Sequence, residues 1–354
     1  MESTTKGLRR VASAIAGAML VVLGTSAAAA ELAVNRHVDF DADVAGQLPS
    51  LGGANQPTSL TAEPGTSIVV RAAANGIATQ PVVLGAQTGQ QYVSVNTSFP
   101  PVSQGLVRVE ATVSFDRLAL GYFLQTSVGS ATTVVSRLTM NEAGEIKDYM
   151  GGVTVGTYAP NQPFRVRMDI DMSARTWSVA IDDEMNGFQD DPVTANLAFA
   201  NDATAISAVG SVDASMQMSF TTSPPTTVAY DDIEVWLMTE TVSLELAPGP
   251  FPSIVVPRSR LLIALSIPST ASFDAATVNP ATVRFGATGT EAQPASYALE
   301  DVDGDGDADL ALRFRTQQTG IQCGDTSAIL TGRTYSGVMI RGSVAIRTIG
   351  CVSP

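Results

Sequence analysis

The chain has 354 residues and a formal net charge of −14 at neutral pH, with 15% charged side chains. This acidic balance argues against nucleic acid or an anionic membrane surface as a partner, because both repel negative charge. The length suits two domains better than one small sandwich. Aromatic residues are few and short alternating runs recur between turn residues, which favours an all-β protein.

Residues 1–30 have the pattern of a secretory signal peptide. Lys6, Arg9 and Arg10 form a positive start, residues 11–24 are apolar, and residues 28–30 are an alanine cleavage site. The apolar run is too short to span a bilayer. Arg9-Arg10 leaves twin-arginine export as an alternative. We expect a secreted or extracellular protein, with the periplasm or cell surface as further destinations, and a mature net charge of −16 after loss of three positive charges and one negative charge.

Two segments alternate apolar and polar residues with period two. They are residues 106–115, with Val109 and Val113 on one side, and residues 164–171, with Val166 and Met168 on one side. This period predicts half-buried strands. Residues 176–181 follow a short turn and complete a hairpin, with Trp177 in the core. Further strands are expected at residues 67–72, 91–95, 118–127, 132–138, 206–212, 216–221 and 228–237.

Three stretches resemble a known family. VDFDADVAGQLPS, FRVRMDIDMSARTWSVAIDDE and VAYDDIEVW are similar to secreted bacterial members of the concanavalin A-like lectin/glucanase jelly rolls, over residues 36–240. The resemblance implies a two-sheet sandwich. It also implies a concave face that holds saccharide in many relatives and an active site in some.

The chain changes character at residues 239–257, where Pro248, Pro250, Pro252 and Pro257 lie close together. We place an N-terminal concanavalin A-like β-sandwich at residues 31–240 and a smaller β-sandwich-like module at residues 241–354. Strands of the module are expected at residues 260–267, 282–285, 309–315, 327–331 and 338–349. FDAATVNPATVRFG and EDVDGDGDADLALRFRTQQTGIQCGDTSAILTGRTYSGVMI resemble a C-terminal module of exported bacterial proteins.

Five aspartates alternate with other residues over residues 301–309, and the last of them begins the strand expected at residues 309–315. Carboxylates at loop positions 1, 3, 5 and 9 with glycine at position 6 match the spacing that wraps oxygen ligands around Ca²⁺. We expect side-chain oxygens from the first three aspartates, the backbone carbonyl of the fourth, and a direct or water-mediated contact from the fifth. The predicted metal ligands are Asp301, Asp303, Asp305, Asp307 and Asp309, with Gly306 at the sharp turn.

Position 12 of this loop is Leu312, so the bidentate glutamate of an EF-hand is absent. The loop resembles instead the D-x-D-x-D-G-x-x-D calcium loops of integrin-type FG-GAP repeats. A further ligand must come from elsewhere, and Glu300 is one candidate. The alternative is a solvated acidic turn without metal.

The only two cysteines, Cys323 and Cys351, lie near the C-terminus of a chain with an export signal. We expect them to form a disulfide, with two buried free thiols as the alternative. In the chain-entropy model, closing a loop of this length stabilises the fold by about 3 to 4 kcal/mol.

No catalytic residues are predicted. His37 is the only histidine and lies near the start of the mature chain, which makes a nucleophile-histidine-acid device or a zinc site of His and Cys improbable. The glutamate spacing of retaining glucanases is absent. Asp169 and Asp171, and Asp231, Asp232 and Glu234, are read as outward carboxylates on solvated strands.

Aromatic side chains are the other candidates for ligand contact. Parity puts Trp236 on the same side as Glu234, so it is a candidate ligand-binding residue, with packing against the second domain as the alternative. Four tyrosines are further candidates for a groove, but strand parity does not place them on one surface: Tyr92, Tyr122, Tyr149 and Tyr158.

The sequence thus predicts a secreted, non-catalytic, Ca²⁺-binding protein that binds an extracellular polysaccharide or cell-surface glycan or acts in adhesion. The glycan rests on the family resemblance alone. A polysaccharide-cleaving hydrolase or lyase is the first alternative, and a purely structural surface protein is the second. No nucleic acid partner and no membrane span are expected.

Overall fold

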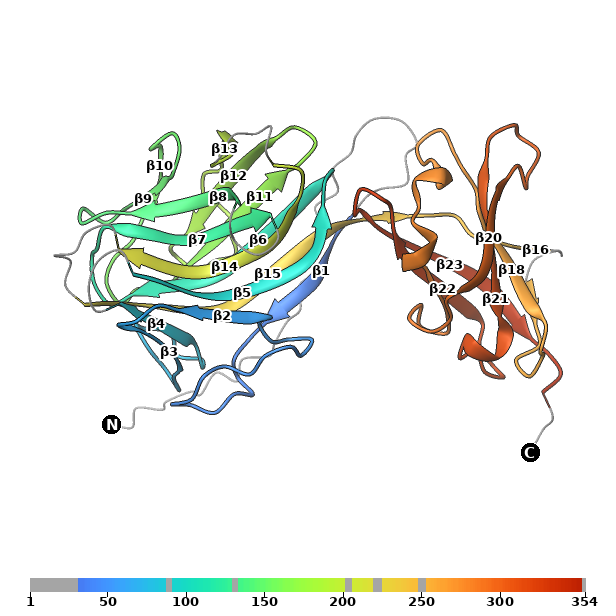
Figure 1. The fold of residues 1–354 in the computed structure, drawn as a ribbon, viewed down its shortest axis with the longest axis horizontal. Helices are drawn as coiled ribbons and strands as arrows, with labels where there is room; N and C mark the ends of the chain where they lie inside the picture. The colour runs from blue at the N-terminus through green and yellow to red at the C-terminus, as the bar shows by residue number, and fades with distance from the viewer. Residues whose placement is uncertain are drawn as a thin grey trace, which may run out of the picture.

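The computed structural model describes residues 31–86, 91–128, 133–200, 206–218, 225–247 and 253–351. In these ranges the chain is all-β with short 3₁₀ turns, as the sequence predicts. Two large hydrophobic cores are present, one built from residues 38–237 and one from residues 242–346, beside a small cluster of Ile77, Val83 and Ala229. Figure 1 shows the corresponding two β-rich bodies side by side. The expected signal segment lies outside the described residues.

Two sheets face each other in the first body. One has the strand order β13-β12-β11-β6-β15, and β1 and β4 also pair with β15 while β3 pairs with β4. Its strands are β1 (Glu31–Val38), β3 (Thr66–Val70), β4 (Val82–Ala86), β6 (Leu106–Phe115), β11 (Phe164–Asp171), β12 (Thr176–Asp182), β13 (Thr194–Ala198) and β15 (Thr226–Thr241).

The second sheet of this body has seven strands in the order β10-β9-β8-β7-β14-β5-β2. These strands are β2 (Ser59–Ala62), β5 (Tyr92–Val102), β7 (Gly121–Val128), β8 (Thr133–Met140), β9 (Glu145–Asp148), β10 (Thr154–Thr157) and β14 (Val209–Met218).

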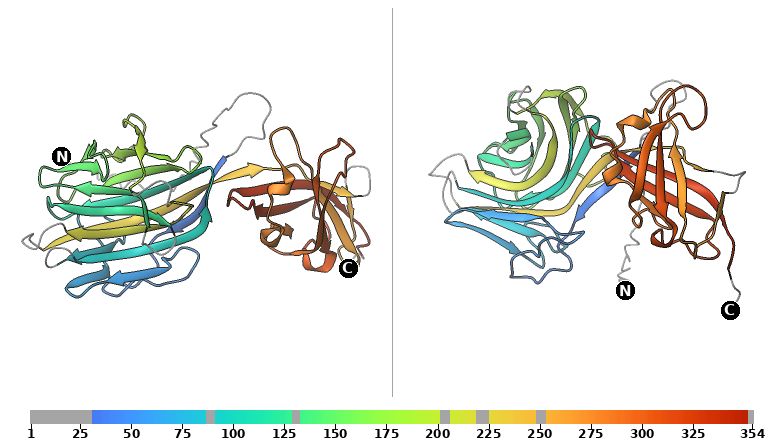
Figure 2. Two further views of the ribbon diagram at one scale, coloured as in Figure 1. Left: turned by 45° about the horizontal axis from the view of Figure 1, so that its top comes forward. Right: turned by 45° about the vertical axis from the view of Figure 1, so that its right-hand side comes forward.

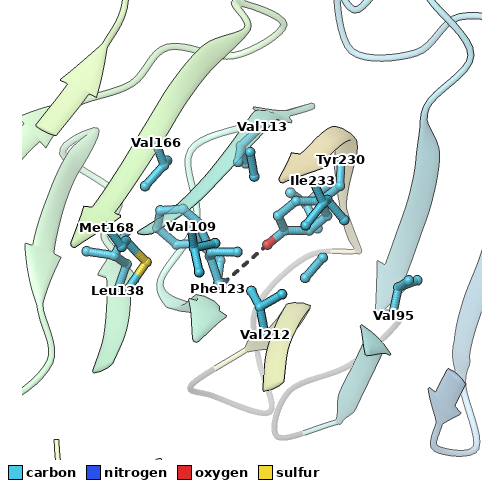
Figure 3. Close-up of a cluster of buried hydrophobic side chains, with 14 of the residues drawn as sticks. Val95, Val109, Val113, Phe123, Leu138, Val166, Met168, Val212, Tyr230 and Ile233 are labelled. Carbon is cyan, nitrogen blue, oxygen red and sulfur yellow. Dashed lines mark hydrogen bonds between the residues drawn. The ribbon is translucent and has the colours of Figure 1, made fainter. Parts of the chain in front are cut away.

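Period-two alternation decides which side chains fill the space between the sheets. In β11 every second residue is buried, and Val166 and Met168 point inward as predicted. Figure 3 shows these residues with Val109 and Val113 of β6, opposite Phe123 and Val212 of the seven-stranded sheet. Trp177 is also in the core, and its Nε1 donates to the carbonyl of Ala198 at 2.9 Å.

The strand prediction was wrong at β14. The sequence predicts two strands there, at residues 206–212 and 216–221. The structure has one strand, Val209–Met218, which runs through Asp213 and pairs with β5 along its length. The register against β7 shifts between Asp213 and Met216, so the gap between the two predicted strands corresponds to a bulge within one strand.

The second body is a smaller sandwich. A four-stranded sheet, β16-β18-β21-β20, faces β19, β22 and β23, and β17 pairs with β23. The elements are β16 (Glu245–Ala247), β17 (Ser253–Val255), β18 (Leu262–Ile267), β19 (Arg284–Gly286), β20 (Pro294–Glu300), β21 (Asp309–Arg315), β22 (Ser327–Arg333) and β23 (Met339–Thr348), with 3₁₀ turns η2 (Ala275–Thr277), η3 (Pro280–Thr282) and η4 (Thr316–Gln318). The sequence analysis did not predict β20.

Strand β15 passes through the expected boundary near residue 240. Its last residues, Thr239–Thr241, pair in parallel with Met339–Arg341 of β23, so one sheet continues from the first body into the second. Both views in Figure 2 show β15, in yellow and orange, leading from one body to the other. The division at residues 240/241 stays a prediction, and prolines 248, 250 and 252 lie outside the described residues. None of the described residues form a helix long and apolar enough to cross a membrane.

Candidate functional site

The aspartate-rich loop connects β20 to β21, and its last carboxylate is the best anchored. Asp309 is the first residue of β21 and is fully buried. Its Oδ1 accepts the N–H of Ser269 at 2.8 Å and its Oδ2 accepts the N–H of Val302 at 2.8 Å. Asp309 therefore fixes the loop to the sandwich, because both of its oxygens accept backbone hydrogen bonds.

Three of the five predicted ligands gather at one point. Carboxylate oxygens of Asp301, Asp303 and Asp309 lie within 4.8 Å of one another, which is close enough to hold one metal ion. The side chains of Asp305 and Asp307 are outside this set, and their part in binding, with the backbone carbonyl of Asp307, stays a prediction. Gly306 has a φ of 101°, in the left-handed region, as its place at the turn requires.

The donor chemistry of this set fits a hard divalent cation. Its oxygens are carboxylates, which Ca²⁺ and Mg²⁺ prefer, and no described histidine or cysteine belongs to it. The negative charges also act on each other: the hydrogen bond that the protonated Asp307 carboxyl donates to Asp305, then desolvation, and then the charges of Asp305, Asp309 and Asp303 raise the pKa of Asp307. A bound cation would reverse the sign of this repulsion.

The two cysteines form a disulfide. Cys323 and Cys351 are 28 residues apart in sequence, with their Cα atoms 5.9 Å apart. A nearby hydrogen bond from the N–H of Gly324 to Oγ1 of Thr348, at 2.9 Å, joins the same two segments. The end of the chain is thus tied to the segment that precedes β22.

Trp236 lies on the outer side of β15, as parity predicts, and is half-buried. Its neighbours in register are Val34 of β1 and Arg108 of β6. Its indole Nε1 is buried and makes no hydrogen bond in the described part of the chain. The role of Trp236 as a ligand-binding residue stays a prediction.

The acidic residues set aside as outward carboxylates are mostly held in ion pairs and turns. Arg108 binds Asp169 through Nε and Nη2, at 2.6 and 2.8 Å. Asp171 caps the following turn by accepting the N–H groups of Ser173 and Ala174. These contacts hold the sheet together and leave neither carboxylate as a paired acid for catalysis.

The third group of acids surrounds the single histidine. His37 Nδ1 lies 3.2 Å from Glu234 Oε1, and Nε2 lies 3.5 Å from Asp232 Oδ1. Hydrogen bonds to Asp232 and Glu234 raise the pKa of His37 to about 10, so it is an imidazolium at neutral pH. Such a group does not act as a general base.

The description of Asp231 as solvated was wrong. Asp231 is buried and accepts a hydrogen bond from the hydroxyl of Thr79. The segment that holds Thr79 covers this side of β15, where Ile77 packs with Ala229, and β15 then shifts register between Asp231 and Glu234, where Asp232 has a φ of 47°. Because of this bulge, the carboxylates of Asp231 and Asp232 lie in different surroundings, which strict alternation along a strand does not predict.

The structure brings three of the four candidate tyrosines to one surface. Tyr122 and Tyr92 are both in register with Gln217 of β14, on the side of the seven-stranded sheet that faces away from the core. Tyr149 contacts Tyr122 edge to face, with ring centroids 5.4 Å apart. Tyr158 is instead in the core, where its hydroxyl accepts the N–H of Ala119. We call the surface around Tyr92, Tyr122 and Tyr149 the tyrosine face.

A buried carboxylate lies on the same side of the seven-stranded sheet as these tyrosines. Asp213 is 1% exposed and accepts hydrogen bonds from Asn96 Nδ2 at 2.6 Å, Gln125 Nε2 at 3.1 Å and Ser127 Oγ at 3.3 Å. These donors come from the two strands on either side of β14, because β5 and β7 both pair with it. We call these four residues the Asp213 network.

Arg137 of β8 joins this network to the tyrosines. Its Nε donates to Gln125 Oε1 at 2.8 Å. Its guanidinium carbon lies 5.1 Å from the ring centroids of both Tyr122 and Tyr149, which is a cation–π distance. The part of the chain that the structure describes contains no carboxylate in ion-pair contact with Arg137. Its terminal nitrogens are thus donors with no anion of their own.

Burial raises the pKa values of two groups on this surface, Tyr92 and Asp213. Burial, and then the charge of Asp213, raises the pKa of Tyr92 to about 12. Burial also raises the pKa of Asp213, while hydrogen bonds from Asn96 and Gln125 act in the opposite direction. Tyr92 therefore stays a neutral phenol at physiological pH. The surface offers fixed hydrogen-bond donors and acceptors between aromatic rings.

The sequence analysis missed Asp213, Asn96, Gln125 and Arg137. One signal was present: β5 and β14 place Ser, Asn, Asp and Gln at alternate positions, where β6 and β11 place Arg, Glu and Asp. Small polar side chains on an outward face indicate a surface that is partly covered rather than open to water. The error at β14 hid this pattern, because the two strands predicted there, residues 206–212 and 216–221, do not include Asp213.

Comparison with known proteins assigns no family. No family model matches the chain and no curated protein matches it. Among solved structures, it is similar to a sialidase (10% identity, 50% of this chain, 16% of the sialidase, TM-score 0.39), to the cellulose induced protein Cip1 (12%, 50% and 91%, 0.35), and to alginate lyase AlgAT5 from Polysaccharide Lyase family 7 (11%, 44% and 77%, 0.32). The chain thus spans only 16% of the sialidase. These TM-scores are too low to assign an activity, and the concanavalin A-like resemblance stays a prediction.

Proposed function

We propose that this protein is a secreted, calcium-stabilised glycan-binding protein that holds saccharide on the tyrosine face without cleaving it. The observation that carries the proposal is that Arg137 contacts the rings of both Tyr122 and Tyr149 and also donates a hydrogen bond to Gln125 of the Asp213 network. Aromatic rings stack on the apolar faces of sugar rings, and planar polar groups bind their hydroxyls.

The arrangement supports binding because its polar groups are held in place before any ligand arrives. Gln125 contacts Asp213, Tyr92 and Arg137 at the same time, so its orientation is determined on three sides. Tyr149 is 40% exposed and Arg137 is half-buried, so both are accessible at the rim. A rigid polar floor with an accessible aromatic rim lowers the ordering cost of binding.

Two features favour binding over cleavage. Glycoside hydrolysis uses two carboxyl groups flanking the bond, whereas the Asp213 network contains one carboxylate that already accepts three hydrogen bonds. Base-catalysed elimination requires a proton acceptor, and a phenol with a pKa of about 12 is a poor one at neutral pH.

The metal belongs to the second body. Asp301, Asp303 and Asp309 would hold the ion, and its chemistry would be charge neutralisation between β20 and β21. We propose Ca²⁺ because it accepts many protein oxygens, whereas Mg²⁺ keeps most of its waters. The role is structural, because Asp309 ties the same loop to Ser269.

The test is binding of residues 31–354 to a panel of neutral and uronate oligosaccharides by calorimetric titration in calcium. Tyr149→Ala is expected to weaken binding at least tenfold, because it removes one ring of the rim. Tyr335→Ala is the matched control, since this tyrosine is exposed and lies in the second body. Equal affinities for the two variants would reject the tyrosine face as the binding surface.

The same samples distinguish binding from catalysis. After prolonged incubation with each oligosaccharide, mass spectrometry is expected to recover the ligand intact. New reducing ends would indicate a hydrolase, and unsaturated uronates would indicate a lyase. Either product, if lost in Tyr149→Ala, would replace the non-catalytic proposal with an enzyme at the same surface.

A further inference from the structure

The strand that precedes the aspartate loop leaves one edge of its sheet open. Strand β20 is the last strand of the order β16-β18-β21-β20, and in the described part of the chain it pairs only with β21. From Ala295 to Glu300 every residue is exposed. Its outer N–H and C=O groups form an unpaired row of the kind that accepts another strand.

Two large apolar side chains of β20 are exposed although they lie on the face of the sheet that packs into the core. Tyr297 and Leu299 lie opposite Leu312 and Leu310 in register, so they share the face that packs into the core. They are nevertheless 61% and 53% exposed. Beside them is a shallow cleft lined by Asn279, Pro280, Ala281, Gln293, Pro294, Tyr297 and Tyr335. The core side of the sandwich is therefore incomplete at this edge.

The usual protection of an edge strand is missing along most of β20. Residues 295–299 carry no charge, and Pro294 stands only at the start. Natural edges are commonly blocked by lysine, by proline or by a covering element. An uncharged stretch of this kind pairs with a second strand at low electrostatic cost.

We infer that β20 pairs antiparallel with β20 of a second copy of this chain, about a two-fold axis near Tyr297. This interaction is distinct from glycan binding, because it lies in the second body. Antiparallel pairing about Tyr297 would place the two Tyr297 side chains opposite each other on the core side, and would add each Leu299 to the partner's open edge.

Charge favours a second copy and an antiparallel orientation. The outer side of β20 ends in Glu300, next to the acidic loop, whereas Arg313 flanks Ser296 near the other end. Arg313 and Arg315 are exposed, and neither has an ion-pair partner among the described residues. A two-fold axis at Tyr297 brings Glu300 of one copy opposite Pro294 of the other. Pro294 is at the end of β20 near Arg313, so each Glu300 approaches the arginines of the other copy.

The same symmetry keeps the metal loops apart. Four residues separate Tyr297 from Asp301, so at about 3.4 Å per residue the two loops would start roughly 27 Å from each other. This exceeds the screening length of about 8 Å at physiological ionic strength. Parallel pairing would instead set one acidic loop against the other. The edge is thus self-complementary in one orientation only.

The test is sedimentation velocity of residues 31–354 over a hundredfold concentration range in calcium. The parent is expected to form a dimer, and Leu299→Lys is expected to weaken association at least tenfold. Leu261→Lys is the matched control, because Leu261 is exposed, apolar and outside β20. A parent that stays monomeric throughout the range, or a Leu299→Lys dimer as tight as the parent's, would overturn the proposal.

A charge exchange tests the orientation. Glu300→Arg and Arg313→Glu are each expected to weaken the dimer, and the double variant is expected to recover most of the affinity. Oxidised Tyr297→Cys is expected to give a disulfide-linked dimer, whereas Leu261→Cys gives none. No recovery in the double variant, together with no Tyr297→Cys cross-link, would reject the antiparallel β20 pairing even if a dimer exists.

Discussion

The hydroxyl of Tyr230 donates a hydrogen bond to the backbone carbonyl of Ser215 at 2.7 Å and so joins the two sheets of the first body. Tyr230 comes from β15 and Ser215 from β14. The same hydroxyl accepts the N–H of Leu124, a residue of β7 with a φ of 38°. Figure 3 shows the Tyr230 hydroxyl reaching from one sheet toward the other within the buried cluster.

Tyr230→Phe is expected to destabilise the protein by about 1 to 3 kcal/mol, because it leaves a buried carbonyl and a buried N–H without their partner. Chemical denaturation followed by tryptophan fluorescence measures this loss. Tyr335→Phe is the control, since its hydroxyl is at an exposed site. A loss of the same size in both variants would show that the cross-sheet bond contributes nothing specific.

His37 makes stability depend on pH on the alkaline side. Its pKa in the folded state is raised to about 10 by Asp232 and Glu234. The stabilisation it provides is complete below about pH 6.5, the unfolded value, and disappears as pH rises through about 10. The melting temperature of the parent is expected to fall over this window more than that of His37→Gln. Parallel melting curves against pH for the two proteins would contradict the assignment.

Asp231 also makes stability fall as pH rises, but in the acidic range. Burial raises its pKa to about 6, so the folded state binds a proton that the unfolded state has already released. The parent therefore loses stability from this group as pH rises from about 4 to about 6. Asp231→Asn lacks this penalty. Its free energy of unfolding minus that of the parent is therefore expected to be about 1 to 2 kcal/mol larger at pH 7 than at pH 4. Denaturant unfolding at both pH values measures the difference, and no change between them would refute it.

The metal loop gives a prediction that depends on the ion. Asp303→Ala is expected to lower the melting temperature in calcium and to change little in excess chelator, because one of three carboxylates is lost. At a calcium concentration a hundredfold above the dissociation constant, binding adds about 2.7 kcal/mol to stability. Asp325→Ala, an acidic residue outside the set, is the control. Equal losses of Asp303→Ala with and without chelator would remove the metal from the explanation.

The disulfide is expected to hold the end of β23 against the segment before β22. Replacing both Cys323 and Cys351 by serine is expected to destabilise the second body by about 3 to 4 kcal/mol, for a loop that joins residues 28 apart. Thermal unfolding with and without reductant measures this. Reductant should lower the melting temperature of the parent and leave the double serine variant unchanged, and the reverse pattern would be incompatible with a stabilising disulfide.

Local patterns in the sequence determined the all-β class, the inward faces of β6 and β11, the hairpin of β11 and β12, and the position of Trp177 in the core. They also determined which loop concentrates carboxylates. These features follow from the period-two geometry of a strand and from the spacing of residues within one loop, so neighbours in the chain are sufficient to specify them.

Only the tertiary structure decided that Tyr92, Tyr122 and Tyr149 share a surface with Arg137 and Asp213, and that β20 leaves an open edge. The tyrosine face depends on the order β8-β7-β14-β5, which places residues from distant parts of the chain side by side. The exposure of Tyr297 depends on which strand ends the sheet. Strand order and bulges such as the one after Asp213 are set by long-range pairing and by packing between sheets. The alternation of residues within one strand therefore does not reveal them.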